Sequence, residues 1–273
     1  MGDRPPLNRI LDQLAGYLEF EISEGARPAE FTTHPLKTAA VPAAKPAFVP
    51  AAVRAAPTPP APEPAAPPAA EPRAARPAAD AAGAKAGMKK LETAVASCTK
   101  CALHRTRTKT VPGQGCLAPE ILFVGEGPGA EEDAQGLAFV GAAGQLLTKM
   151  IQAMGFQRDE VFIANVVKCR PPENRQPLPE EMEACLPYLR EQIALLNPGV
   201  IVVLGAVALK GLLGLDGIMR RRGQWHAYED IPAMPTFHPS YLLRTPSAKK
   251  DTWEDLKEVL RRVGRPIPAV KKG

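Results

Sequence analysis

Four cysteines are the residues of this chain whose spacing most clearly indicates chemistry: Cys98-x-x-Cys101, followed by Cys169 and Cys185. A Cys-x-x-Cys pair in a chain that carries no secretory signal is typical of a metal or redox site. Four thiolates suit either a tetrahedral zinc ion or an iron–sulfur cluster. Because fifteen residues separate the last two cysteines, unlike the close pairs of a zinc ribbon, the spacing favours a [4Fe–4S] cluster, with zinc as the alternative. The remaining cysteine, Cys116, is expected to be a free thiol.

The elements that must position these side chains alternate between strand and helix. Short runs that are apolar throughout predict strands at 121–124, 161–167, 200–204 and 233–237. Helical spacing and end signals predict helices at 142–154, 179–196, 206–213 and 249–262. Apolar strands that are each followed by a helix predict an α/β fold, in which a mainly parallel, four-stranded sheet is doubly covered to give three layers, α/β/α.

Ligands of such sheets bind beyond the carboxyl ends of the strands. One of these ends carries the segment 125–130, which formally matches the dinucleotide motif G-x-G-x-x-A. Pro128 removes a backbone N–H from the phosphate cradle that this motif would need, and the acidic run 131–133 would repel a pyrophosphate. We therefore expect no nucleotide cofactor. A carboxylate-bearing loop at this place is better suited to orienting water or to stabilising a positive charge.

Composition divides the chain into three parts. Residues 1–27 carry apolar side chains at helical spacing, which predicts an amphipathic N-terminal helix. Residues 28–87 hold 14 of the 31 prolines and are otherwise mostly alanine, so they are expected to form a disordered linker. Residues 88–273 are expected to form one domain that contains the metal site.

Positive charge follows the same division. Residues 1–87 carry 9 basic and 9 acidic side chains, whereas residues 88–273 carry 25 and 20, so the net charge of +5 lies on the second part. Its basic residues form clusters in predicted loops: Arg105, Arg107 and Lys109; Lys168, Arg170 and Arg175; Arg220, Arg221 and Arg222; Arg244, Lys249 and Lys250. This distribution predicts a polyanionic partner, with nucleic acid as the first candidate.

Further motifs follow one another in the chain, in register with the four cysteines. They are Gly125-Glu126-Gly127-Pro128-Gly129 with Glu132-Asp133, then Phe139-Val140-Gly141, the segment Asn165–Arg175, and His238-Pro239-Ser240-Tyr241-Leu242-Leu243-Arg244. Together they resemble the family 4 uracil-DNA glycosylases, the iron–sulfur type of bacteria and archaea. The likeness covers essentially all of 88–265 and does not extend to 1–87. It implies a uracil-DNA glycosylase fold and a hydrolase of N-glycosyl bonds, which flips uracil out of DNA and releases it to start base excision repair.

The resemblance also implies a role for each site residue. Phe139 would stack on the flipped base, and His238 would bind uracil O2 as charge builds on the leaving base. Asn165 would donate to O4 of uracil and accept from its N3–H. Cytosine has a donor and an acceptor in the opposite places, so it would not match this amide. The implied catalytic residues are Glu126, Glu132, Asn174 and His238, of which the first three would position water and offset charge on the sugar. The implied substrate-binding residues are Glu126, Gly127, Pro128, Phe139, Asn165 and His238.

The DNA and metal contacts are implied in the same way. Tyr241, Leu242 and Leu243 would form an apolar wedge that fills the gap left by the extruded nucleotide. The implied DNA-binding residues are Arg170, Arg175, Leu242, Leu243 and Arg244. The implied ligands of a [4Fe–4S] cluster, expected to be structural, are Cys98, Cys101, Cys169 and Cys185. Relatives that trap DNA covalently carry a Lys-Arg-Arg-Ile-His insertion where this chain has Pro-Pro-Glu-Asn-Arg, so free uracil is the expected product.

Two other classes of function stay open at this point. The chain could be a non-catalytic, DNA-binding iron–sulfur module associated with replication or repair, or a glycosylase with a broader choice of deaminated bases. No apolar run approaches the roughly 20 residues of a membrane span. We therefore expect a cytoplasmic, nucleoid-associated monomer with no membrane partner. Its N-terminal helix is expected to dock to a replication or repair protein.

Overall fold

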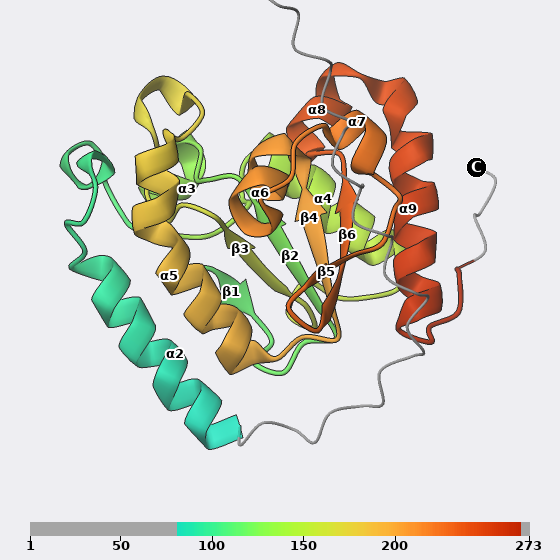
Figure 1. Cartoon of the computed structure of the whole chain (residues 1–273), viewed down its shortest axis with the longest axis horizontal. Coiled ribbons are helices and arrows are strands. Elements are labelled where there is room, and N and C mark those ends of the chain that lie inside the picture. The colour runs from blue at the N-terminus through green and yellow to red at the C-terminus, as the bar shows by residue number, and fades with distance from the viewer. Residues whose placement is uncertain (1–80, 269–273) are drawn as a thin grey trace, which may run out of the picture. The chain divides into compact units, whose positions relative to one another are not determined.

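A six-stranded mixed sheet runs through the computed structural model, which describes residues 81–268 (Figure 1). The strand order is β1-β3-β2-β4-β6-β5. Neighbouring strands are parallel through the centre, which consists of β3 (Phe162–Asn165), β2 (Ile121–Gly125), β4 (Val200–Leu204) and β6 (Ile231–Thr236). Both edges are antiparallel: β1 (Gln114–Gly115) pairs with β3, and β5 (His226–Tyr228) pairs with β6.

The four predicted strands form this parallel centre, but the sheet has six strands rather than four. The edge strands β1 and β5 are only two and three residues long, and each residue is half-buried or exposed. A strand that short and that polar has neither the apolar run nor the alternation by which strands are predicted. The predicted mainly parallel α/β sheet is confirmed, but the predicted number of strands is too low because it omits the two edge strands.

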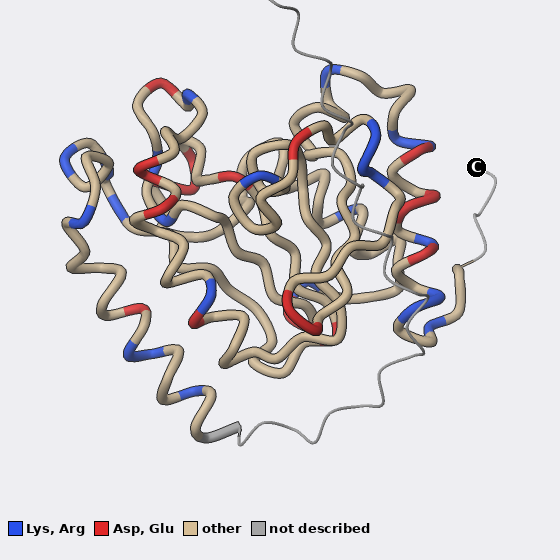
Figure 2. The backbone as a smooth tube through the Cα atoms, in the orientation of Figure 1, with Lys and Arg blue, Asp and Glu red and all other residues tan. Residues whose placement is uncertain are grey.

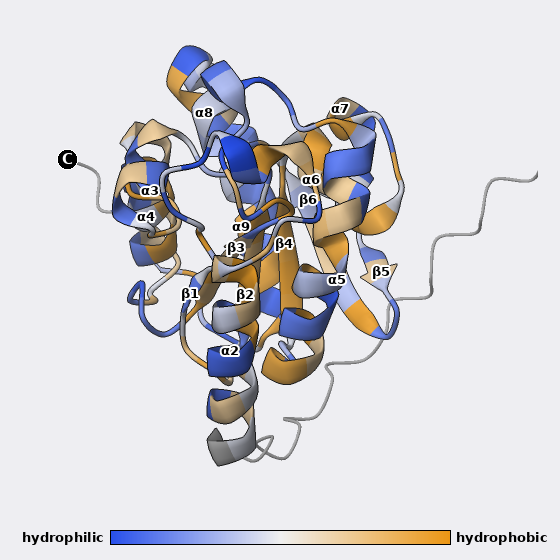
Figure 3. Cartoon of the chain, turned by 90° about the vertical axis from the view of Figure 1, so that its left-hand side faces the viewer, coloured by the Kyte–Doolittle hydropathy of each residue, from blue (hydrophilic) through white to orange (hydrophobic). Residues whose placement is uncertain are grey.

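Helices cover both faces of the sheet, as the three-layer prediction required. Successive strand residues face opposite sides: Leu122 and Val124 belong to one core cluster, whereas Ile121 and Phe123 belong to the other. The first cluster includes residues of α2 (Ala81–Ala96), α5 (Pro179–Leu196) and α6 (Gly205–Leu213). The second includes residues of α4 (Ala142–Ala153) and α9 (Lys249–Arg262). Figure 3 shows the hydrophobic strands enclosed between these layers.

The helix α2 corrects the predicted start of the domain. It begins at Ala81, seven residues before the expected boundary at 88, and it packs on α5. Ala84 in its first turns is buried, and Gly87 lies so close to Leu195 that a Cβ at that position would meet its Cδ2 at 2.6 Å. The alanine-rich composition that suggested a linker is therefore helical from Ala81 onward. The helix expected over 1–27 and the rest of the expected linker lie outside the described residues.

Short elements gather at the carboxyl edge of the sheet. They are α3 (Ala130–Gln135), α7 (Ile218–Arg221) and α8 (Pro239–Arg244), with 3-10 turns at Ala102–Arg105, Pro172–Asn174 and Pro246–Ala248. The chain passes from β2 to β3 on one side and then crosses to β4 on the other side of β2. Such a switch point leaves a crevice beyond the strand ends. None of the helices between residues 81 and 268 is long and apolar enough to cross a membrane.

Candidate active site

An open pocket lies beyond the carboxyl ends of the central strands. The space between its walls is about 840 Å³, a figure that includes solvent at its open mouth. Segments that follow β2, β3 and β6 contribute to its wall. The lining residues are Glu126, Gly127, Pro128, Gly129, Glu132, Phe139, Ala143, Asn165, Pro171, Asn174, Arg175, His238 and Ser240.

The structure brings together all of the residues that were expected to act in catalysis or to hold the base. Each of them lines this one pocket: Glu126, Gly127, Pro128, Glu132, Phe139, Asn165, Asn174 and His238. Of the residues expected to contact DNA, Arg175 also lines it, whereas Arg170, Leu242, Leu243 and Arg244 do not.

Asn165 stands at the carboxyl end of β3 with an unused hydrogen-bond acceptor. The residue is buried, and its Oδ1 has no hydrogen-bond partner in the described part of the chain. Gly125 on the neighbouring strand makes room for it, because a Cβ there would lie 2.5 Å from both Asn165 Oδ1 and the Phe139 ring. A buried acceptor without a partner costs roughly 1–3 kcal/mol. It is therefore available to a donor on a ligand.

Phe139 enters the pocket from a strained turn that an arginine braces. Its φ of 52° is unusual for a bulky residue. Arg158 Nη2 donates to the carbonyls of Ala138 and Phe139, and its Nη1 donates to Thr148 Oγ1 at 2.9 Å. Burial lowers the pKa of Arg158. The ring that it steadies lies 5.7 Å from His238, centroid to centroid.

His238 precedes α8 and is held as a neutral ring. Ser240 donates its backbone N–H to Nδ1 at 3.1 Å, and its Oγ lies 2.7 Å from the same atom. A backbone N–H can only donate, so Nδ1 is an acceptor and the ring proton sits on Nε2. Burial lowers the pKa of His238 to about 4; the charge of Arg244 adds to this shift and Glu132 opposes it. Gly205 allows the close approach, since a Cβ there would meet His238 Cβ at 2.8 Å.

Two carboxylates of the pocket have different surroundings. Glu132 is fully engaged: its Oε1 accepts from the backbone N–H groups of Val140 and Gly141 at 2.8 Å each, and its Oε2 accepts from Gly129 at 3.0 Å. These bonds tie α3 to the turn that carries Phe139. For Glu126, burial raises the pKa. A carboxylate pulled out of water in this way interacts more strongly with nearby positive charge.

Residues 170–175 form one rim of the pocket. Arg170 Nε donates to Asn174 Oδ1 at 2.8 Å, and Asn174 has a left-handed backbone. Arg175 makes a two-pronged ion pair with Glu181, whose side chain is almost fully buried. Such paired geometry fixes the direction of the guanidinium. The pair anchors this rim to the start of α5.

The helix α8 corrects the expected apolar wedge. Leu242 is only 1% exposed and packs with Phe237 and Ala248, so it belongs to the core and not to a DNA-facing tip. Leu243 is 45% exposed, and Arg244 follows it at the surface. Residues 239–244 are helical, so neighbouring side chains point in different directions and only one of the two leucines can face solvent.

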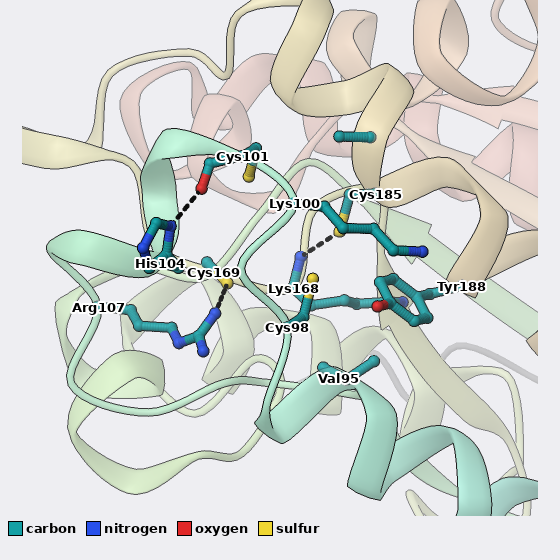
Figure 4. Close-up of a pocket in the computed structure, with 11 residues that line it drawn as sticks. Val95, Cys98, Lys100, Cys101, His104, Arg107, Lys168, Cys169, Cys185 and Tyr188 are labelled. Carbon is teal, nitrogen blue, oxygen red and sulfur yellow. Dashed lines mark hydrogen bonds between the residues drawn. The ribbon is translucent and has the colours of Figure 1, made fainter.

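The four cysteines expected to hold a metal line a second pocket (Figure 4). They come from the loop after α2, the segment after β3, and α5. Arg107 Nη1 donates to Cys169 Sγ at 3.1 Å, and the backbone N–H of Lys168 donates to Cys185 Sγ at 3.2 Å. Cys116 lies elsewhere, after β1.

Four cysteine sulfurs line this one pocket. Such a donor set suits either an iron–sulfur cluster or a tetrahedral zinc ion. Burial raises the pKa of Cys185 to about 11 and also raises those of Cys101 and Cys169. A bound cation would stabilise the thiolates, and N–H groups already point at two of the sulfurs.

Lys168 overturns part of the predicted basic loop. It is 1% exposed, so it is not a surface charge, and burial lowers its pKa to about 8. Its Nζ donates to the carbonyl of Asn165 and to Gln192 Oε1. The buried lysine therefore fastens the end of β3 to α5, between the open pocket and the cysteine pocket.

Sequence reasoning missed the residues that support these functional side chains. Arg158, Ser240 and Gln192 each act through hydrogen bonds to segments distant in sequence or to a neighbouring turn. Ser240 belongs to the His-Pro-Ser motif, and a hydroxyl two residues after a histidine could have suggested its contact. Arg158 and Gln192 carry no such signal, because an arginine in a turn and a glutamine in a helix are usually exposed.

Comparison with known proteins places this geometry in a family. A sequence model described as "Uracil DNA glycosylase superfamily" matches residues 112–257, and the chain belongs to that superfamily. It is 50% identical to a type-4 uracil-DNA glycosylase of Thermotoga maritima over 167 residues, which cover 59% of this chain and 85% of the relative. Proteins of the same name from Sulfurisphaera tokodaii and Archaeoglobus fulgidus are 44% and 40% identical, over 63% and 64% of this chain and 83% and 93% of theirs. The uracil-DNA glycosylase-like fold expected from the motifs is thereby confirmed.

Proposed function

We propose that this protein is a uracil-DNA glycosylase, which takes uracil out of DNA and hydrolyses the bond between its N1 and C1′ of deoxyribose. One observation carries the proposal within this superfamily. The unpaired acceptor of Asn165, the ring of Phe139 and the neutral His238 converge on one pocket. By releasing free uracil, the protein starts base excision repair.

Base selection follows from the amide of Asn165. Its Oδ1 accepts from uracil N3–H, and its Nδ2 donates to O4, while Phe139 stacks on the base. Cytosine offers an acceptor at N3 and a donor at N4, so both contacts would be lost. A buried amide facing mismatched groups disfavours the wrong base strongly.

Cleavage requires charge stabilisation at two places. As the bond between N1 and C1′ breaks, its electron pair stays on uracil and the sugar becomes positive. His238 Nε2–H donates to O2, where the new negative charge spreads. The oxygen of a water molecule then bonds to C1′ and loses a proton to solvent, while the uracil anion takes up a proton, so the products are free uracil and an abasic sugar.

We assign the sugar side of the pocket to Glu126. Its carboxylate is partly buried, and neither of its oxygens accepts a hydrogen bond within residues 81–268. Glu132 already accepts three backbone N–H groups, so it positions the Phe139 turn. Asn174 on the rim helps to position the water molecule that attacks C1′. In this arrangement Glu126 offsets the positive sugar and orients the nucleophile.

We propose in addition that Cys98, Cys101, Cys169 and Cys185 hold a [4Fe–4S] cluster with a structural role. Bound there, it joins the loop after α2 to β3 and α5, next to the rim at 170–175. Iron and acid-labile sulfide in the purified protein would support this assignment, and zinc without iron would refute it. A several-fold change in turnover when the intact cluster is oxidised or reduced would argue against a purely structural role.

The activity is tested on synthetic DNA that carries one uracil. Release of free uracil, followed by chromatography, is expected from the unaltered protein and not from the His238→Ala or Asn165→Ala variants. DNA binding without any uracil release would instead identify a non-catalytic DNA-binding module. A panel of other deaminated bases separates a uracil enzyme from one of broader choice.

A further inference from the structure

Two short helices beside the pocket repeat one surface pattern. In α8 the buried Leu242 is followed by the exposed Leu243 and then by Arg244. In α7 the packed Ile218 is followed by Met219, which is 66% exposed, and then by Arg220. Met219 is the most exposed large apolar side chain between residues 81 and 268. Each helix thus presents one exposed apolar side chain next to an arginine.

The two helices share one small core. Ile218 and Tyr241 both pack against the cluster of Phe237, Leu242 and Ala248. The α7 segment also contacts β6, the strand that leads to His238. In Figures 1 and 2, α7 and the basic end of α8 lie at the same edge of the domain, beyond the ends of the central strands. Because His238 and Ser240 at the start of α8 line the pocket, the surface that α8 forms with α7 begins at the pocket wall.

The three arginines of this segment have different tasks. Arg222 is structural: it pairs with Asp255, donates to the carbonyl of Asp251 and lies over the Phe237 ring at 5.3 Å. Arg220 and Arg221 have no acidic partner among residues 81–268. Arg222 thus fixes α7 to the body of the domain. Of the two preceding arginines, Arg220 is exposed and Arg221 is half-buried, and neither is held by a carboxylate of residues 81–268.

We infer that α7 forms a second DNA-contact surface with the end of α8, which holds the backbone flanking the extruded nucleotide. Arg220 and Arg221 bind phosphates, and Met219 packs against deoxyribose. The inference rests on the proposed function, which brings DNA to the pocket mouth. Charge complementarity selects the occupant, because DNA has a phosphate on every nucleotide and arginine binds phosphate in a two-pronged manner.

Salt dependence provides the measurement. The logarithm of DNA affinity falls as the logarithm of salt concentration rises. Each phosphate contact makes this slope steeper by about 0.9 on duplex DNA and by about 0.7 on a single strand. The double variant Arg220→Gln/Arg221→Gln is expected to lower that slope by about 1.8 or 1.4, and to weaken binding of uracil-free DNA about tenfold at moderate salt. In uracil release it should raise KM and leave kcat unchanged. Met219→Gln should raise KM without altering the slope, because it removes no charge.

A matched control variant distinguishes a local contact with DNA from the electrostatic effect of the protein's net charge. Lys89 and Lys90 are exposed on α2, away from the pocket, and Lys89→Gln/Lys90→Gln removes the same charge. The inference requires this control to keep the original slope within about 0.5. Shortening the DNA on the flank that lies over α7 should abolish the difference between the Arg220/Arg221 variant and the unaltered protein.

The outcomes distinguish this inference from the proposed function. An unchanged slope and KM in the Arg220/Arg221 variant would overturn it, as would an equal loss in the lysine control. Binding of uracil-free DNA does not depend on catalysis, so its result stands whether or not uracil is released. Failure of uracil release by the unaltered protein would refute the proposed function alone.

Discussion

Asn165 shows how a functional residue can lower the stability of the protein that carries it. Its buried Oδ1 lacks a partner, although almost every other buried side-chain polar atom of the described chain has one. Only two further atoms, His226 Nε2 and Arg262 Nε, share that condition between residues 81 and 268. An unsatisfied acceptor at a pocket wall is what a ligand donor would complete.

A substitution at Asn165 should therefore separate stability from activity. Asn165→Leu keeps the volume and removes both the unpaired acceptor and the amide donor. We expect kcat/KM for uracil release to fall at least about 100-fold, since two hydrogen bonds of roughly 1.4 kcal/mol each are lost. Thermal unfolding should show an equal or higher Tm, because the desolvated acceptor is gone. A lower Tm in proportion to the lost activity would mean that Asn165 is simply structural.

The pH profile should report Glu126 rather than His238. Burial lowers the pKa of His238 from 6.5 to about 4, so the ring stays neutral above that pH, and burial raises the pKa of Glu126 above 4.5. As pH falls, Glu126 is protonated first and loses its attraction for the positive sugar. We expect kcat/KM to show no inflection from His238 near pH 6.5 and to fall on the acid side as Glu126 is protonated, and Glu126→Gln should remove that acid limb. An inflection near pH 6.5 that disappears in His238→Gln would contradict this assignment.

The same shift of His238 links stability to pH. The unfolded chain takes up a proton on this histidine near pH 6.5, whereas the folded protein does so only near pH 4. Below pH 6.5 the unfolded state binds more protons, so this group lowers the free energy of unfolding as pH falls toward 4. Ser240 donates its backbone N–H to Nδ1, which fixes the tautomer that the proposed mechanism uses.

At the scale of elements, the turn that carries Phe139 depends on contacts from outside it. Glu132 of α3 holds its backbone N–H groups, and Arg158 from the connection between α4 and β3 holds its carbonyls. The positive φ of Phe139 is maintained because both sides of the turn are bonded. Neither brace needs to touch the substrate.

Arg158 is therefore a positioning residue whose loss should slow the reaction. Arg158→Met removes charged hydrogen bonds worth about 1.5–3 kcal/mol to the turn. We expect single-turnover uracil release to fall about tenfold, with partial recovery in Arg158→Lys, which can still donate to one carbonyl. Arg261→Met, on an exposed arginine of α9, serves as the control. Equal rates for Arg158→Met and the control would contradict the role.

Elements differ in how far the sequence predicts them. The bounds of β4, α5 and α9 agree with the prediction, because apolar runs or helical periodicity end at clear signals such as Pro179. The helices α7 and α8 were missed because four or six residues are too few to show a period. Leu242 was expected at a tip because the sequence does not show that Phe237 and Ala248 enclose it. Lys168 was expected at the surface because its partners, Gln192 and the Asn165 carbonyl, meet it only in the folded sheet.

The pocket itself was more predictable than its supports. Strand ends in a parallel sheet meet at one edge, so glycines, carboxylates and amides that follow strands are brought together by topology alone. Hydrogen bonds made by Arg158 and Ser240 depend on side-chain directions that no spacing encodes. The sequence thus identifies which residues face the ligand, and the structure adds which residues hold them in place.

At the scale of the whole molecule, the two sites are parts of one edge. Lys168 donates to the Asn165 carbonyl and directly precedes Cys169, so Asn165 of the open pocket and one cysteine of the second pocket lie in the same five-residue segment. The basic segment at α7 lies beyond the ends of the same central strands (Figures 1 and 2). DNA that delivers a base to this pocket would meet positive charge there, in keeping with the net charge of this part of the chain.

The helix α2 decides where the independent domain begins. A chain that starts at residue 81 keeps the whole helix, whereas one that starts at 88 loses its first two turns, including the buried Ala84 and the close contact between Gly87 and Leu195. We expect both to release uracil from short oligonucleotides at the rate of the full chain. The shorter one should unfold about 2–5 °C lower, because roughly 1 kcal/mol of packing on α5 is lost. Calorimetry of the two variants makes this comparison with residues 1–80 removed from both. Equal Tm values would show that these turns add nothing to the domain, and a large loss of turnover in the longer variant would assign part of the active machinery to residues 1–80.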